Sequence, residues 1–149
     1  MFTAAEGMAL RAKGAISELK AATWYLSEGY QVFFPVCDGG VVDFIAYKPG
    51  KTPELVQVKT AHWIESSGNR YLQLRVGRTK GTRRGPITRD WDPTNPEDHY
   101  DYLIGVFEDR MWKIPKAEFP EGKKTIYLEK TGRRPSKVDY DPGSWLVKV

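Results

Sequence analysis

The 149-residue sequence has one cysteine, Cys37, and two histidines, His62 and His99. A single cysteine excludes an internal disulfide, and we expect Cys37 to be a small buried hydrophobic residue because no second Cys or His lies near it. The two histidines are far apart and match no zinc-binding spacing. Disulfide-stabilised and zinc-stabilised folds are therefore not indicated.

Long hydrophobic runs are also missing. The sequence contains no apolar stretch of about 18 residues and no positively charged segment followed by an apolar core, so it predicts neither a membrane-spanning helix nor a secretory signal. We expect a soluble, cytoplasmic protein that has no membrane partner. Internal repeats and heptads are absent, and 40% hydrophobic residues are enough for one core, which predicts a single domain over residues 1–149.

The positive charge is concentrated in one segment. The formal net charge is +4, which favours an anionic partner. Residues 75–89 carry six basic side chains and no acid, interrupted by glycines that let a backbone approach a groove closely. These six are Arg75, Arg78, Lys80, Arg83, Arg84 and Arg89. We expect them to bind DNA within a long loop over residues 66–99, and a solvated surface loop is the alternative.

The chain opens with the pattern of one amphipathic helix. Thr3 and Glu6 form a capping box, and the helix is expected to run to about Ser27 and to end at Gly29, or to start later because Gly14 weakens its first half. Its apolar stripe, which would face the core, is Met8, Ala12, Ala15, Ile16, Leu19, Ala22, Thr23 and Leu26.

Strand-like runs follow the helix. Three of them form an expected antiparallel meander, at residues 30–36, 40–47 and 54–64. Further strands are predicted at 71–76 and 124–130. Residues 100–107 and 110–115 are expected to form a hairpin that turns at Glu108 and Asp109.

Polar residues interrupt two of the apolar strands. Asp43 lies in the first, and Gln57 and Lys59 lie two apart in the second, so that the latter two share a face while Val58 points the other way. If the strands pair antiparallel, Asp43 lies beside them. The Asp43 carboxylate, the Gln57 amide oxygen and the Val58 carbonyl suit Mg²⁺, with Lys59 close to an activated water.

Glu18 is a candidate fourth group in this site. It lies on the shoulder of the helix's apolar stripe, where a carboxylate can point along the sheet. Taken alone, such a glutamate is usually solvated and a strand lysine usually extends to solvent. The combination with Asp43, Gln57 and Lys59 favours a catalytic and metal-binding role, with Glu18 a further metal ligand.

These residues resemble the PD-(D/E)XK nuclease superfamily. The likeness consists of Gly14 and Glu18 on a first helix, GYQVFFP leading into a strand, Asp43 at a strand's end and Gln-Val-Lys after a hairpin. It covers roughly residues 10–64 and extends weakly to residues 100–115, which are similar to a later core hairpin of the family. It is nearest to the small homing endonucleases of group I introns, in which Gln replaces the second acid. Val42 stands where the name-giving Pro would be, and Gln57 removes one negative charge from the metal site.

The resemblance implies an α/β, restriction-endonuclease-like three-layer core in which a mixed central sheet is flanked by helices. It also implies hydrolysis of double-stranded DNA with Mg²⁺, or Mn²⁺ as a substitute, by a site-specific endonuclease from a bacterial or phage-like context. A Holliday-junction-resolving or other structure-selective nuclease and a catalytically inactive DNA-binding module are the alternatives. Because one site cuts one strand, we expect a homo-oligomer, either a dimer or a dimer of dimers.

Overall fold

In the computed structural model, which describes residues 3–37, 39–76, 78–82, 85–89, 96, 99–119, 125–132 and 140–149, one long helix opens the fold. This helix, α1, spans Ala4–Ser27. The Thr3 hydroxyl accepts from the Glu6 N–H at 3.1 Å and the Glu6 carboxylate accepts from the Thr3 N–H at 2.7 Å, which confirms the capping box. Gly29, at φ +89°, follows the end of the helix, as expected.

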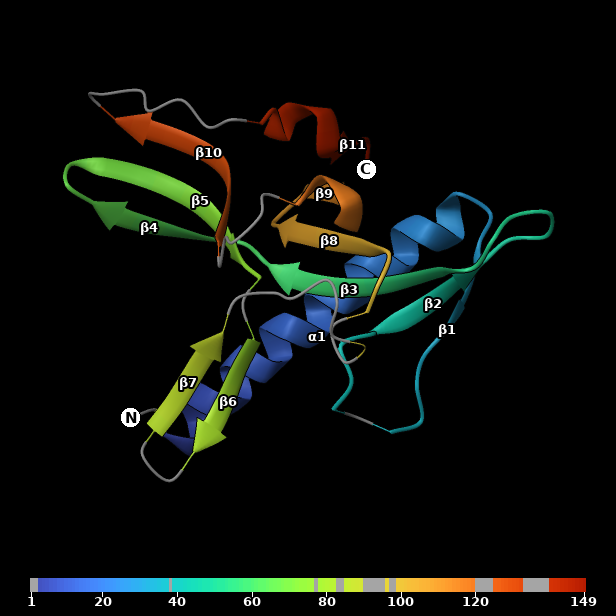
Figure 1. The fold of residues 1–149 in the computed structure, drawn as a ribbon, viewed down its shortest axis with the longest axis horizontal. Helices are drawn as coiled ribbons and strands as arrows, with labels where there is room; N and C mark the ends of the chain where they lie inside the picture. Colours follow the sequence, from blue (N-terminus) through green and yellow to red (C-terminus); the bar gives the residue numbers. More distant parts are fainter. Residues whose placement is uncertain are drawn as a thin grey trace.

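The main sheet has six strands in the order β1-β2-β3-β8-β9-β11. The strands are β1 Gln31–Phe33, β2 Phe44–Tyr47, β3 Glu54–Thr60, β8 Tyr102–Phe107, β9 Arg110–Pro115 and β11 Leu146–Val147. The first three form the expected antiparallel meander, but the third strand ends at Thr60 and not at residue 64. On its other side, β3 pairs parallel with β8. The parallel pair makes the sheet mixed and places the ends of β3 and β8 on one side of the molecule (Figure 1).

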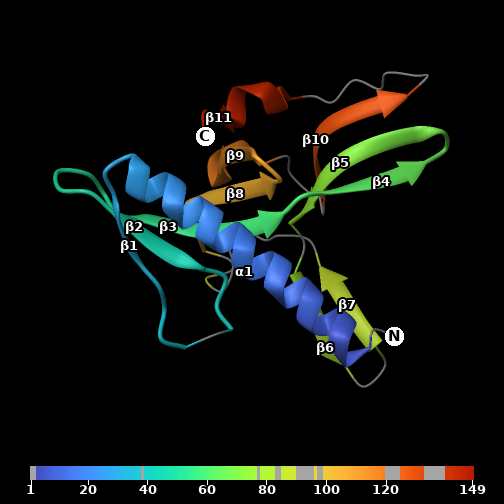
Figure 2. The same cartoon turned by 180° about the vertical axis from the view of Figure 1, so that it is seen from behind.

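Helix α1 covers one face of this sheet (Figure 2). It contacts the sheet through small side chains, with Ala21 and Ala22 buried against Phe44, Val56 and Ile104. Small residues let the helix lie close to the strands, and one large ring, Tyr25, fills the remaining space.

The predicted core stripe of α1 is correct for Ala22 but wrong for its larger members. Met8, Ile16, Leu19 and Leu26 are exposed, and the buried residues of the helix are Ser17, Ala21, Ala22 and Tyr25. The face with the larger apolar side chains therefore points away from the sheet, because close packing selects the small residues.

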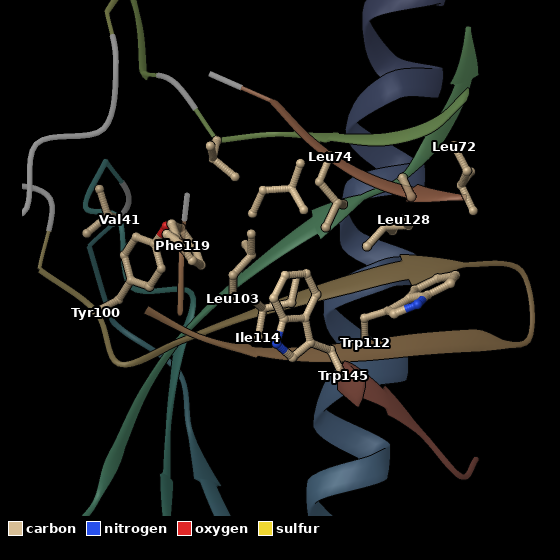
Figure 3. Packing of buried hydrophobic residues seen from close by; sticks show 13 residues of the cluster. Val41, Leu72, Leu74, Tyr100, Leu103, Trp112, Ile114, Phe119, Leu128 and Trp145 are labelled. Carbon is tan, nitrogen blue, oxygen red and sulfur yellow. The ribbon is translucent and has the colours of Figure 1, made fainter. Parts of the chain in front are cut away.

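A second sheet covers the opposite face. It has the order β10-β5-β4, with β4 at His62–Ser66, β5 at Asn69–Arg75 and β10 at Thr125–Gly132. Leu72 and Leu74 of β5 share a core with Leu103 and Ile114 of the main sheet (Figure 3). The two sheets meet so closely that a Cβ on Gly105 would lie 2.6 Å from Leu74 Cδ1.

These layers confirm the predicted fold class. A mixed central sheet lies between α1 and a three-stranded sheet, so the architecture has three layers as expected. One outer layer is a β-sheet, joined by the short 3-10 helix η3 at Pro142–Trp145, where helices were expected. A further 3-10 turn, η2, spans Lys116–Glu118.

Residues 66–99, expected as a long loop, contain strands over much of the part that the structure describes. After β5, β6 (Arg78–Thr82) and β7 (Gly85–Arg89) pair antiparallel as a hairpin of their own. Figures 1 and 2 show this hairpin and the β10-β5-β4 sheet extending from the same end of the main sheet, the end at which β3 finishes. The prediction that this segment contacts DNA remains a prediction.

Two smaller expectations have different outcomes. The β8–β9 hairpin turns at Glu108 and Asp109, and Glu108 takes a positive φ of 52° there. Cys37 is exposed, so the prediction of a buried cysteine is wrong. It falls in the bend between β1 and β2 and not on a strand, which leaves no sheet face to bury it.

Candidate active site

Asp43 is attached to β3 through both its backbone and its side chain. It immediately precedes β2, where the register pairs Phe44 with Val56. Its N–H donates to the Val56 carbonyl at 2.8 Å, and its carboxylate accepts from the Val58 N–H at 2.6 Å. The two short bonds hold the carboxylate at the edge of β3, level with the Gln-Val-Lys sequence.

Three predicted site residues come together around this carboxylate. Burial raises the pKa of Asp43, while the Val58 N–H, the positive charge of Lys59 and a hydrogen bond from the Glu18 side chain act to lower it. Each of these groups stabilises the ionised carboxylate, yet removal from water outweighs them. Asp43 and Glu18 are therefore two carboxyl groups in one partly dehydrated site, next to an ammonium group.

Glu18 reaches the site because α1 is bonded to the end of β3. The hydroxyls of Ser17 and Thr60 lie 2.7 Å apart, and Ser17 is buried in an otherwise apolar contact. These two residues are the direct neighbours of Glu18 and Lys59. The bond therefore fixes the position of the helix relative to the strand at the point where the site forms. Sequence reasoning missed it, although Ser17 lies four and eight residues before the buried Ala21 and Tyr25.

Gln57 and Val58 complete the predicted donor set. Gln57 is half-buried on β3, two residues before Lys59. The N–H and C=O of one strand residue point to the same neighbouring strand. Since the Val58 N–H donates to Asp43, the Val58 carbonyl lies on that same edge of β3.

The available donors fit an oxygen-preferring cation. The residues that the structure describes include no group of three or more His, Cys, Asp or Glu side chains that could hold a metal. Glu18 and Asp43 supply two carboxyl groups, Val58 a backbone carbonyl and Gln57 an amide oxygen. This set contains no sulfur or imidazole, so it suits Mg²⁺ or Mn²⁺ better than Zn²⁺. A divalent cation would relieve the repulsion between the two carboxylates.

The predicted DNA-binding residues that the structure describes belong to other elements than this cluster. Arg75 is exposed at the end of β5. Arg78, Lys80 and Arg89 occupy backbone positions of the β6–β7 hairpin, where Arg78 pairs with Arg89. Arg83 and Arg84 lie outside the described residues. The backbone therefore places the described part of the basic segment on an arm that extends from the end of the main sheet at which β3 finishes (Figure 1).

A mixed sheet with an acid just before one strand and a lysine near the end of the next is the arrangement expected of a nuclease with a restriction-endonuclease-like fold. The chain belongs to the PD-(D/E)XK endonuclease family, whose model matches residues 8–140. The predicted superfamily is thereby confirmed, and the protein is an endodeoxyribonuclease.

The fold is similar to one solved homing endonuclease. The bacterial homing endonuclease I-Ssp6803I superposes with a TM-score of 0.70 and 22% sequence identity, covering 91% of this chain and 87% of that chain. No curated protein matches the sequence significantly. Within the part of the chain that the structure describes, no helix is both long and apolar enough to cross a membrane.

Proposed function

We propose that the protein is a Mg²⁺-dependent, site-specific endonuclease of the homing type that cuts double-stranded DNA. The observation that carries this proposal is the cluster of Asp43, Glu18 and Lys59 around the Val58 N–H. The similarity to a homing endonuclease supports the type. The donor set described above supports the cation, with Mn²⁺ as a substitute.

Each side chain has a defined task in this proposal. Asp43 and Glu18 hold the cation together with the Gln57 amide oxygen and the Val58 carbonyl. When bound, Mg²⁺ would favour ionisation of a water molecule and neutralise charge on the scissile phosphate. Lys59 places a fixed positive charge where negative charge develops during hydrolysis, or orients the attacking water.

The dehydrated setting of Asp43 supports this role. Charges act more strongly on one another where water is excluded, so Lys59 stabilises the transition state more effectively here than on an open surface. The hydrogen bond from Val58 fixes the carboxylate before substrate arrives, which reduces the reorganisation needed for the reaction. Because the described residues form one such cluster, we expect at least two copies to be needed to cut both strands.

Substitution within the cluster tests the proposal. Asp43→Ala should abolish Mg²⁺-dependent cleavage while DNA binding persists. Lys59→Ala should raise the barrier of the chemical step by about 2 to 4 kcal/mol, as the loss of a preorganised charge stabiliser does. Cleavage rates in single turnover and DNA affinities by fluorescence anisotropy measure the two effects. Wild-type rates in either variant would contradict the site assignment.

The substrates in the same assay separate the proposed type from its alternatives. Linear random-sequence DNA, a four-way junction and DNA from the gene's own genomic neighbourhood are each incubated with and without Mg²⁺. A homing-type enzyme cuts only the last substrate, at one position. Preferential cutting of the junction, irrespective of sequence, would instead identify a structure-selective nuclease.

A further inference from the structure

The outward face of α1 is unusually apolar. A surface helix normally buries its apolar stripe and presents polar residues to water. Here Met8, Ile16, Leu19 and Leu26 are 69%, 51%, 61% and 57% exposed, and the face that packs on the sheet consists mainly of small residues. We call these four residues the outer stripe of α1; their spacings of eight, three and seven residues keep them on one side of the helix.

A groove adjoins the outer stripe. It has a volume of about 950 Å³ and runs between α1 and the β8–β9 turn. Ile16 and Leu19 line it from the helix, and Met111 and Val149 line it from the strands and the C-terminal residues. Two members of the outer stripe are thus shared with the groove, which makes one continuous apolar surface. Such a patch with a polar rim is typical of an interaction site.

The rim of the groove carries equal numbers of opposite charges. The lining residues include three basic groups, Lys20, Arg110 and Lys148, and three acidic groups, Glu28, Glu108 and Asp109. The rim is therefore formally neutral, whereas the whole chain carries +4. DNA or another partner of one charge sign gains no net attraction there. A two-fold axis, in contrast, can place the acids of one copy against the bases of another.

The size of the surface sets a condition on an interface between two copies. From Met8 to Leu26 the helix extends about 27 Å, so a strip about 10 Å wide buries on the order of 300 Å² per copy. A stable interface needs about 800 Å² per partner. The stripe alone is too small, and the adjoining groove has to contribute. Ile16 and Leu19, which belong to both, should then lie near the centre of the contact.

We propose that the outer stripe of α1 and its groove form the interface between two copies of this chain, related by a two-fold axis. The proposal rests on the proposed function, because an enzyme with one site per chain needs a second copy to cut both strands. The interface residue Leu19 directly follows Glu18. The same helix that completes each active site therefore also joins the two sites, which fixes the distance between them.

The association state of charged variants tests the interface. Leu19→Glu introduces a charge at the centre of the contact, and Val36→Glu makes the same kind of change at a fully exposed residue that does not line the groove. We expect wild type and Val36→Glu to sediment as dimers or as dimers of dimers. Leu19→Glu should weaken dimerisation by roughly tenfold or more, a loss of about 1.4 kcal/mol.

Folding controls keep this test interpretable. Leu19 is exposed in the single chain, so Leu19→Glu should keep the far-UV circular dichroism of wild type. If it unfolds, Ile16→Glu makes the same test. A monomeric wild type overturns the proposal, and so does a Leu19→Glu variant that dimerises like wild type. A variant that loses affinity for DNA without a change in association would place DNA on this surface and also overturn it.

Plasmid cleavage separates this interface from the proposed function. If both are right, monomeric Leu19→Glu still nicks supercoiled plasmid containing the target but does not linearise it, whereas Asp43→Ala remains dimeric and does neither. If Leu19→Glu disrupts the dimer but the wild-type protein cuts no DNA, the interface is supported and the proposed function is contradicted.

Discussion

At the scale of single residues, the charge of Asp43 lowers the stability of the fold. Burial raises its pKa in the folded protein, so the folded state holds the proton more tightly than the unfolded chain does. The free energy of unfolding therefore carries a favourable contribution at low pH. This contribution is lost as the pH rises from the ordinary Asp value of about 3.9 through the raised value.

Asp43→Asn should therefore be more stable than wild type at neutral pH without divalent cations. Asparagine can still accept from the Val58 N–H but carries no charge to dehydrate. The difference in free energy of unfolding between variant and wild type should grow with pH across the window given above and then stay constant. Urea unfolding at a series of pH values measures it.

Divalent cations should reverse this order. Mg²⁺ that binds only the folded state stabilises wild type, and a variant without the ligand gains little. The proposed role of Asp43 would be contradicted if the difference in free energy of unfolding between Asp43→Asn and wild type did not change with pH. It would also be contradicted if Mg²⁺ stabilised both proteins equally.

Ser17 is the residue through which the helix position should affect the site. Ser17→Ala removes the partner of the Thr60 hydroxyl and should cost about 0.5 to 1.5 kcal/mol of stability. Because Ser17 and Thr60 adjoin Glu18 and Lys59, the Mg²⁺ affinity should fall as well. A double-mutant cycle with Thr60→Val should give a coupling energy of similar size, and isothermal calorimetry measures the affinity.

Thr23→Ala provides the matched control for this prediction. The Thr23 hydroxyl is exposed and donates to the Leu19 carbonyl within the same helix, so its removal changes no contact between helix and strand. Ser17→Ala should differ from this control in Mg²⁺ affinity. Equal affinities would reduce the Ser17–Thr60 bond to a purely structural contact.

The sequence predicts part of the site because polar residues stand out in apolar strands. Asp43 and Lys59 were identified in this way, and the structure brings them together with Glu18. Strand β3, which carries Lys59, also contains Glu54. Glu54 is buried and forms a 2.6 Å ion pair with Lys113 of β9. That partner lies 59 positions away in the sequence, so no local pattern separates a structural charge from a catalytic one.

At the scale of elements, α1 shows the limit of hydrophobic periodicity. The pattern correctly predicts the existence, start and end of the helix. It does not predict which face is buried, because a close helix–sheet contact selects small residues and leaves the larger apolar ones outside. The exposed stripe is the observation on which the proposed interface between two copies is based.

The β6–β7 hairpin should provide DNA affinity that depends on salt. Its register places Arg78 opposite Arg89, with Lys80 two positions along the same strand. An Ala substitution that removes one phosphate interaction should reduce the slope of log K against log[salt] by about 0.9 and weaken binding to all sequences equally. Arg75→Ala, at the end of β5, should behave in the same way.

A second class of effect is expected for the two basic residues that come between β6 and β7 in the sequence and lie outside the described residues. We expect Arg83 or Arg84 to contact guanine, in which case substitution relaxes preference at one base pair by about 1 to 3 kcal/mol. Lys51→Ala is the control, because its turn between β2 and β3 lies at the opposite end of the main sheet (Figure 1). Unchanged affinity and specificity after all six basic residues are neutralised would place DNA elsewhere.

At the scale of the whole molecule, local sequence patterns predict where the strands lie better than they predict which strands pair with each other. The β1-β2-β3 meander and the β8–β9 hairpin connect neighbours in sequence, and both were predicted. The parallel pairing of β3 with β8 and the packing of Leu74 on Gly105 join residues more than 30 positions apart. Such contacts depend on the shapes of two assembled sheets, which a one-dimensional pattern does not contain.

The isolated pairing of the β6–β7 hairpin has a consequence for how such a protein can change over time. Its two strands pair with each other in a sheet of their own, between β5 and β8 in the sequence. The ladders of the other two sheets therefore do not depend on it. Lengthening a loop costs only about 0.6 kcal/mol per doubling. The rest of the fold should therefore tolerate insertions, deletions and substitutions in this hairpin. Related proteins could in this way acquire new DNA target sequences while they keep the same candidate active site.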